Sequence, residues 1–128
     1  MKKDALKDKI IFSLSQQRGF GNGEWIMNIA LDPKQSIEIR KQALFWAGQN
    51  GGTSIEAFSS LYDKMTDAEI KEQLIFVFSQ KRDPKALDKL MSIAKSDKDK
   101  ELRSKAVFWL GQSRDPRAAK FLEDLISK

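Results

Sequence analysis

A short apolar phrase with a fixed polar ending recurs four times along the chain. Each copy opens with phenylalanine and closes four residues later with glutamine. Leu or Ile stands six positions before the phenylalanine, a basic residue follows it, and two apolar residues directly precede the phenylalanine. The copies lie at residues 12–16, 45–49, 76–80 and 108–112, so the steps between them are 33, 31 and 32 residues. A near-constant period of this length is typical of repeat proteins.

The hydrophobic spacing inside each repeat predicts two helices. In residues 101–112 most apolar side chains share one broad arc at about 100° per residue, which indicates an amphipathic helix. Phe108 lies off that arc, and a helix with two apolar sides is expected to pack on both. Asp115-Pro116 then ends this helix and places proline at the first position of the next. The apolar face expected of the second helices consists of Trp25, Ile26, Ile29, Ala30, Ile55, Phe58, Leu61, Tyr62, Ala86, Leu87, Leu90, Met91, Ala94, Ala118, Leu122, Leu125 and Ile126.

No strand pattern interrupts these helices, so the sequence predicts an all-α fold. Helix pairs that repeat in this way stack into an α/α superhelix, or α-solenoid. We expect one repeat domain over residues 1–128, with repeats at about 4–34, 35–66, 67–98 and 99–128. Trp109, Phe121 and Ile126 leave an apolar outer face on the last repeat. That face predicts either a further repeat of a longer array or self-association through the C-terminal repeat.

The recurring aromatic residues are expected to fill the core. Trp46 and Trp109 share a column that Ser13 and Val77 occupy in the other two repeats, which indicates duplication of a two-repeat block. Wedging between adjacent helices is the favoured role of the tryptophans, and an exposed aromatic site is the alternative. If the phenylalanines are core residues, Phe108→Ala should cost about 3–5 kcal/mol, and so should the same change at residue 45.

Three further sets of equivalent positions in the repeats, which we call columns, have structural interpretations. The glutamines that close the phrase can donate to the last carbonyls of each first helix, which lack helical partners, and ligand binding is the alternative role. The basic column is expected to form ion pairs with acids in the preceding turns, each worth little if exposed. Gly48 and Gly111 stand where a helix prefers alanine by about 1 kcal/mol, so close approach of the second helix is the expected reason for them. The basic column is Lys7, Arg40, Lys71 and Arg103, and the acids are Asp32, Asp67 and Asp99.

Two segments resemble known repeats. Residues 101–126, ELRSKAVFWLGQSRDPRAAKFLEDLI, resemble a bacterial HEAT-like (PBS-lyase HEAT-like) repeat, and residues 37–49, IEIRKQALFWAGQ, resemble its neighbour. The shared features are the Leu/Ile-Arg opening, the small-apolar pair, the Leu-Gly-Gln near the end of the first helix and the Asp-Pro turn. The resemblance implies stacked helical repeats that act mostly as scaffolds for other proteins along the second helices, while some relatives bind nucleic acid or act as enzymes. A fold-level analogy does not choose among these functions.

The composition argues against catalysis. The chain has no histidine and no cysteine, so the commonest general base and the usual transition-metal ligands are missing. HEAT-like hydroxylases hold iron through His-Glu pairs, which this sequence cannot supply. No segment matches the motifs of HEAT-like bilin lyases or alkylpurine glycosylases. We therefore expect no enzyme activity, no cofactor and no metal, and a non-catalytic scaffold for protein–protein interaction.

A set of basic residues marks the candidate partner-binding surface. They stand at the turns within the repeats and on the second helices: Arg18, Lys81, Arg82, Lys85, Arg114, Arg117, Lys89 and Lys120. The simpler interpretation is that cations near helix C-termini complement the helix dipole. The functional interpretation is a basic edge that holds an acidic partner, as an alternative to binding along the concave face of the second helices.

Nucleic acid is the weaker partner class for this edge. The net charge of +5 and the pI of about 9.5 are only mildly basic. The basic residues also lack interleaved exposed aromatics in the expected arrangement. No secretory signal or membrane span is present in the sequence, so the cytoplasm is the default expectation.

Overall fold

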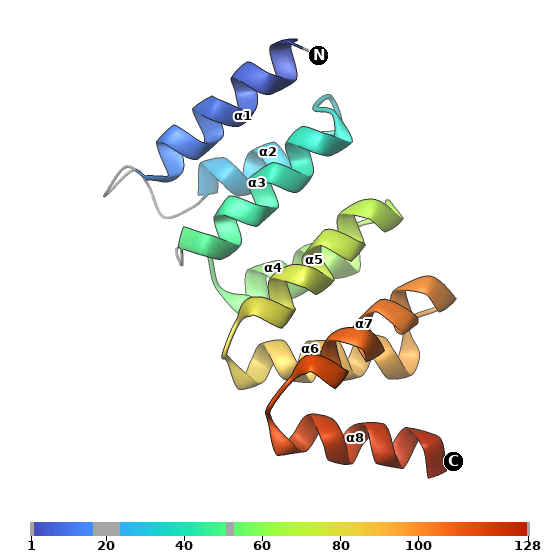
Figure 1. Cartoon of the computed structure of the whole chain (residues 1–128). Helices are drawn as coiled ribbons and strands as arrows, with labels where there is room; N and C mark the ends of the chain where they lie inside the picture. The colour runs from blue at the N-terminus through green and yellow to red at the C-terminus, as the bar shows by residue number, and fades with distance from the viewer. Residues whose placement is uncertain (1, 17–23, 51–52, 128) are drawn as a thin grey trace. The chain divides into compact units, whose positions relative to one another are not determined.

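The computed structural model describes residues 2–16, 24–50 and 53–127. Within these residues the chain forms eight helices and no strand (Figure 1). The predicted all-α solenoid is confirmed, and two helices occupy each predicted repeat. The helices are α1 (Lys2–Ser15), α2 (Glu24–Leu31), α3 (Ile37–Asn50), α4 (Ile55–Lys64), α5 (Ala68–Gln80), α6 (Pro84–Ser96), α7 (Lys100–Gln112) and α8 (Pro116–Ser127).

The helices gather into two compact parts, Met1–Phe58 and Ser59–Lys128, with the division inside α4. In the first part α3 packs against both α1 and α2. In the second part α7 packs against α5, α6 and α8, and α6 also contacts α5 and α8. Helices α6 and α7 are therefore the centre of the second part. The single domain expected over residues 1–128 stays a prediction.

Asp-Pro pairs fix where the last two second helices begin. Asp83 precedes α6, and Pro84 takes the first helical position, where its missing N–H costs nothing. Pro116 opens α8 in the same way after Asp115. Each aspartate accepts a 2.9 Å hydrogen bond from the backbone amide two residues later. The carboxylates thus satisfy amides that have no partner within the helix.

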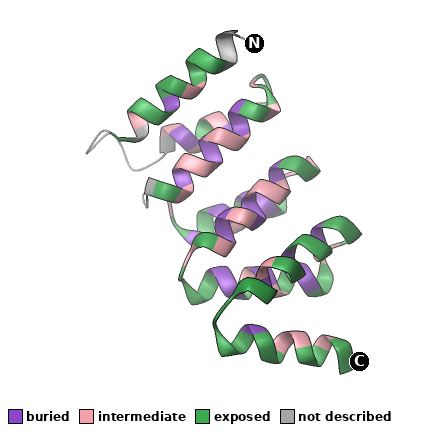
Figure 2. Cartoon of the chain, in the orientation of Figure 1, coloured by how far each residue is buried: buried purple, intermediate pink, exposed green. Residues whose placement is uncertain are grey.

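The apolar face predicted for the second helices is core in α4 and α6. Its buried members, together with two in α2, are Ile26, Ala30, Ile55, Phe58, Leu61, Tyr62, Ala86, Leu87, Leu90 and Ala94 (Figure 2). In α8 only the start is well covered, because Ala118 is buried whereas Ile126 is 87% exposed. The last repeat therefore has an apolar side chain uncovered, as expected; a further repeat or self-association at this end stays a prediction.

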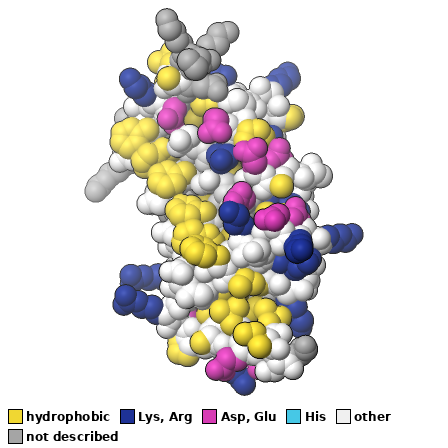
Figure 3. All heavy atoms as spheres, turned by 45° about the vertical axis from the view of Figure 1, so that its right-hand side comes forward, with side chains coloured by type: hydrophobic (Ala, Val, Ile, Leu, Met, Phe, Trp, Pro, Cys, Tyr) yellow, Lys and Arg dark blue, Asp and Glu magenta, His cyan; other side chains and the backbone are white. Residues whose placement is uncertain are grey.

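The phenylalanine column is not the core. Phe108 is 56% exposed and Phe12 is 45% exposed, and apolar side chains reach the surface among the charged ones (Figure 3). At about 100° per residue, Phe108 lies about 200° from Ala106 and Leu110, which are buried, so it faces the other side of α7. Phe78, 1% exposed, marks the true core column two residues after the phenylalanine column. The large destabilisation expected for Phe108→Ala is therefore wrong.

The tryptophans wedge between first helices of successive repeats, as expected. The Trp46 ring centroid lies 4.8 Å from that of Phe12 in α1, at an interplanar angle of 65°. The Trp109 ring centroid lies 5.6 Å from that of Phe76 in α5, at 70°. Both tryptophans are half-buried. They join neighbouring helices and still present part of the indole to the surface.

Gly111 has no close neighbour. A Cβ atom built on this residue would have no described atom within 4 Å. The expectation that glycine here permits close approach of the second helix is therefore wrong. Gly111 is exposed near the end of α7, on the same side as Phe108 three residues earlier.

The two arginines of the basic column cap carbonyls at the ends of second helices, whereas Lys7 Nζ donates to Gln35 Oε1 at 2.9 Å. Arg40 Nε donates to the Ala30 carbonyl at 2.8 Å, and Arg103 Nη1 donates to the Asp97 carbonyl at 2.6 Å. Both carbonyls lie at the C-terminal end of the second helix of the preceding repeat, where carbonyls lack partners and a cation suits the helix dipole. The ion pair expected for Arg103 is replaced by this bond, because the Asp99 carboxylate accepts backbone amides of α7.

A polar cluster ties three helices of the second part, α4, α5 and α6, together. The Tyr62 hydroxyl, on a side chain only 3% exposed, donates to Asp97 Oδ2 at 2.6 Å. Burial, and then this bond to a carboxylate, raises the pKa of Tyr62. The Nζ atoms of Lys71 and Lys89 lie 4.9 and 5.3 Å from the Tyr62 ring centroid, within cation–π range. The Lys89 Nζ also pairs with an α4 carboxylate at 2.6 Å.

Truncation of the buried Phe78 and of the exposed Phe108 should lower the free energy of unfolding by different amounts. We expect Phe78→Ala to lower the free energy of unfolding by about 3–5 kcal/mol, because it empties a buried site. Phe108→Ala should lower it by only about 1 kcal/mol, since it removes an exposed ring and one aromatic contact. Urea unfolding followed by circular dichroism measures both. Equal losses would contradict the assignment of the core column.

Gly111→Ala should stabilise the protein by about 0.5–1 kcal/mol, because alanine is the better helix former and the added methyl meets no described atom. The same urea experiment measures this gain. A loss of stability would mean that another group approaches α7 at this residue.

The Tyr62–Asp97 bond should give a pH-dependent contribution to stability. Burial alone would raise the pKa of Asp97, but the hydrogen bonds from Tyr62 and from the Asp99 amide, with two cations nearby, hold it below its usual 3.8. The stabilisation is therefore present above about pH 4 and disappears as the pH falls through the lowered pKa. We expect Asp97→Asn to be less stable than the wild type at pH 6, with the difference shrinking towards pH 3. Tyr62→Phe should show the same trend, and a pH-independent difference would contradict this assignment.

Candidate functional site

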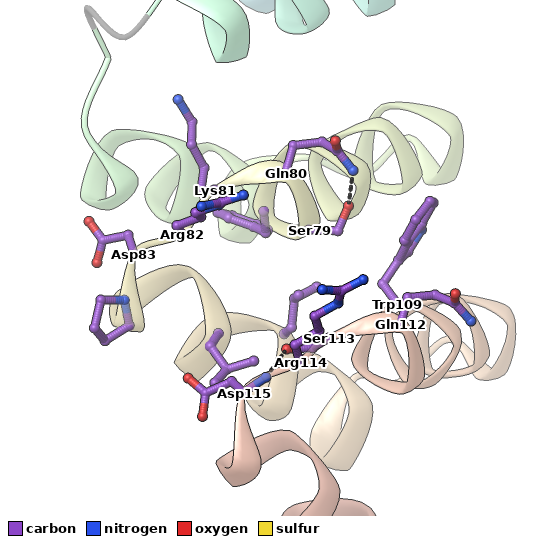
Figure 4. A pocket seen from close by; sticks show the side chains of 14 residues that line it. Ser79, Gln80, Lys81, Arg82, Asp83, Trp109, Gln112, Ser113, Arg114 and Asp115 are labelled. Carbon is purple, nitrogen blue, oxygen red and sulfur yellow. Dashed lines mark hydrogen bonds between the residues drawn. The ribbon is translucent and has the colours of Figure 1, made fainter.

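A groove of about 590 Å³ opens between two turns of the second part (Figure 4). One wall comes from the end of α5 and its turn into α6, and the other comes from the end of α7 and its turn into α8. Buried apolar side chains of α5 and α6 form its floor. The lining residues are Phe78, Ser79, Gln80, Lys81, Arg82, Asp83, Pro84, Leu87, Leu90, Trp109, Gln112, Ser113, Arg114 and Asp115.

The two turns share one backbone geometry, which sets equivalent residues on the two walls. After α5, Lys81 is extended (φ −92°, ψ 139°), and its N–H donates to the Phe78 carbonyl at 3.2 Å. After α7, Ser113 is extended in the same way (φ −75°, ψ 142°), and its N–H donates to a carbonyl three residues earlier at 3.1 Å. Arg82 and Arg114 each follow one residue later. The repeat therefore places the two arginines in matching positions.

Two arginines supply available positive charge in this groove. Within the described part of the chain, its lining carries the cations Lys81, Arg82 and Arg114 and the carboxylates Asp83 and Asp115. Each carboxylate is already bonded to an amide at the start of a second helix. Arg82 and Arg114 make no ion pair with another described residue. An anionic group that enters the groove can therefore meet two guanidinium groups suited to bidentate bonds.

Polar side chains continue the lining along both helix ends. Gln80 Nε2 donates to Ser79 Oγ at 3.1 Å, and Ser79 Oγ donates to the Phe76 carbonyl at 2.6 Å. The Gln80 amide is thus linked to a backbone carbonyl in the last turns of α5 through the Ser79 hydroxyl. Gln112 takes the equivalent position on α7, beside Trp109 (Figure 4). One end of the groove is therefore lined by the Trp109 ring and two glutamine amides, and the charged side chains come from the turns.

The predicted partner-binding residues separate into those that line the groove and those that do not. Arg18 lies outside the described residues, and Lys85 is exposed on α6 but does not line the groove. Arg117 Nη1 pairs with an α6 carboxylate at 3.0 Å. Lys89 pairs with α4 as described, and Lys120 pairs with an acid of its own helix at 3.4 Å. The remaining three, Lys81, Arg82 and Arg114, come together in the groove.

The sequence did not indicate Trp109 as a neighbour of these cations. The expectation that the basic residues lack an adjacent, partly exposed aromatic is wrong here, because Trp109 lines the same groove as Arg82 and Arg114. For Gln80 and Gln112 the sequence favours a structural role, with ligand binding as the alternative. Their fixed place two residues before each arginine was the signal that could have placed them at the same edge.

Among the residues that the structure describes, no group of three or more acidic side chains is placed to hold a metal ion. No helix within residues 2–16, 24–50 and 53–127 has the length and apolar character needed to cross a membrane.

Comparison with known families identifies the repeat. Residues 55–128, more than half of the chain, match the family model for HEAT repeats. A search of curated proteins and a search of solved structures gave no match. HEAT repeats are generally protein-interaction scaffolds and typically non-catalytic. On the helical hairpins described above and this match, the chain belongs to the HEAT repeat family.

Proposed function

We propose that this chain is a non-catalytic scaffold that binds an acidic segment of a partner protein in the groove between the two turns. The observation that carries the proposal is that Lys81, Arg82 and Arg114, from two successive repeats, line one groove over an apolar floor. The volume of about 590 Å³ lies within the usual range for ligand pockets, about 300–1,000 Å³. A short peptide segment fits that description.

The groove is favoured over the face of the second helices. There the candidate cations Lys89, Arg117 and Lys120 already have carboxylate partners. A partner that bound them would have to break those ion pairs, which offsets what it gains. Among the described residues, Arg82 and Arg114 have no ion pair that a partner would have to break.

A protein segment is favoured over nucleic acid. Asp83 and Asp115 stand beside the cations, and a nucleic acid places a phosphate at every nucleotide along its path. A peptide can set carboxylates against the arginines and neutral residues against the two aspartates. Trp109 could stack a base, so nucleic acid is kept as an outcome of the test.

Two finer features also belong to this proposal. The Leu/Ile-Arg opening and the Asp-Pro turn support membership of the bacterial, PBS-lyase type of HEAT-like repeat. The 87% exposed Ile126 supports self-association through the C-terminal repeat. The groove does not depend on either.

Charge reversal at the groove tests the proposal. Fluorescence anisotropy of a labelled Asp/Glu-rich peptide should show saturable binding that weakens as salt rises. Arg82→Glu/Arg114→Glu should weaken it about tenfold or more, because two attractions become two repulsions. The matched control is Lys98→Glu/Lys100→Glu, which changes the net charge equally at exposed residues outside the groove and should have a much smaller effect.

Two results would overturn the proposal. Equal weakening by both double variants would show that the peptide responds only to net charge. Tighter binding of single-stranded DNA or RNA than of the acidic peptide, lost in the arginine variant, would assign the groove to nucleic acid. Far-ultraviolet circular dichroism confirms that each variant is folded.

A further inference from the structure

Three aromatic rings form a cluster beside the groove. The Trp109 ring centroid lies 5.6 Å from that of Phe76 and 5.1 Å from that of Phe108, with interplanar angles of 70° and 80°. These edge-to-face contacts fix the indole between a ring of α5 and a ring of its own helix. Trp109 also lines the groove, so the aromatic cluster and the arginines belong to one continuous surface.

The fold does not account for the exposed side of this cluster. Phe108 is 56% exposed, and the adjacent Val107 is 38% exposed. Gly111, on the same side of α7, leaves that side open where alanine would fit and would favour the helix. This side of α7 is apolar and exposed, and the absence of a side chain at Gly111 leaves space on it. It can therefore accommodate a side chain of a partner.

In the sequence, the same aromatic arrangement of the first part lacks one of the two matching arginines. Trp46 has Phe12 at 4.8 Å and Phe45 at 4.9 Å, with angles of 65° and 85°. In that repeat the position matching Arg114 is Gly51. In the repeat that supplies Arg82, the tryptophan column holds Val77, which is buried. Within the described residues, the cluster at Trp109 is therefore the one that combines tryptophan with arginines from two turns.

We infer that the groove recognises an acidic segment that also carries an aromatic side chain, with its carboxylates at Arg82 and Arg114 and its ring on Trp109. This inference rests on the proposed function and names the sequence class of its partner. Charge complementarity positions the acidic residues, and the partner's ring covers the exposed surface that continues from Trp109 to Phe108. Gln80 and Gln112 supply amide donors and acceptors for the peptide backbone between the two ends.

The test compares two labelled peptides of equal length and charge, one with phenylalanine next to its acidic residues and one with alanine there. We expect the phenylalanine peptide to bind about tenfold more tightly, as burial of one aromatic side chain allows. Phe108→Ala should remove most of this advantage and leave the alanine peptide unaffected. The matched control is Phe45→Ala, which truncates the equivalent ring beside Trp46 and should leave the advantage intact.

A nuclear magnetic resonance readout locates the contact. The chain has three tryptophans, so the ¹H–¹⁵N spectrum has three indole signals, which single Trp→Phe variants assign. The phenylalanine peptide should shift the signal of Trp109 and leave those of Trp25 and Trp46 in place. A shift at Trp46 of equal size would overturn the assignment.

The remaining outcomes separate this inference from the proposed function. Equal affinity of the two peptides, with binding still lost in Arg82→Glu/Arg114→Glu, would overturn the inference and leave the proposed function standing. Failure of both peptides to bind would overturn both. A Trp109 signal that moves with protein concentration in the absence of peptide would assign the aromatic cluster to a second copy of the chain and overturn the inference.

Discussion

No helical hairpin of this chain can bury its apolar sides alone, and this constraint organises the structure. Each first helix has apolar residues over more of its circumference than its own second helix covers, so it depends on the neighbouring repeat. Within Ser59–Lys128 the result is visible at α6 and α7, which pack against each other and against both α5 and α8. The last second helix has fewer neighbours, and Ile126 is consequently 87% exposed. Position in the array, more than residue type, decides which apolar side chains are covered.

Polar contacts between repeats then fix how one hairpin meets the next. Arg103 caps the carbonyl end of α6, the helix before its own, and Arg40 does the same for α2. Tyr62 reaches across to the carboxylate of Asp97. Such contacts hold successive hairpins in one register, which matters because a surface built from two repeats requires both to be set in the same way. The groove is a surface of this kind.

The sequence predicted the helices well because two strong signals agree, hydrophobic spacing and Asp-Pro turns. It placed Phe58, Leu61 and Leu90 in the core correctly for the same reason. It failed at Phe108, since a repeated large apolar residue was taken as core when its angle on the helix set it opposite the buried face. It also failed at Gly111, because intrinsic preference shows that glycine is unfavourable and does not show what lies next to it.

The candidate site was predictable only in part, for a related reason. The repeat period brings Arg82 and Arg114 to one edge, and this follows from the sequence once the turns are known to be equivalent. What the period does not give is which side chains are already paired: Lys89, Arg117 and Lys120 have partners that lie 26, 29 and 4 residues away in the chain. The pairings of Lys89 and Arg117 depend on how the helices pack against one another, whereas Lys120 pairs within its own helix. These pairings decide which cations can meet a ligand.

The same period constrains the partner under the proposed function. Packed helices lie about 8–10 Å apart, so equivalent arginines on successive turns are separated by about that distance. An extended peptide advances about 3.3 Å per residue, which makes this separation close to three residues. Acidic residues spaced by about three positions along an extended segment therefore match the two arginines, and a ring one or two positions beyond them comes to the aromatic end of the groove. The spacing that lets the hairpins bury their apolar sides thus also sets the sequence pattern that the surface can recognise.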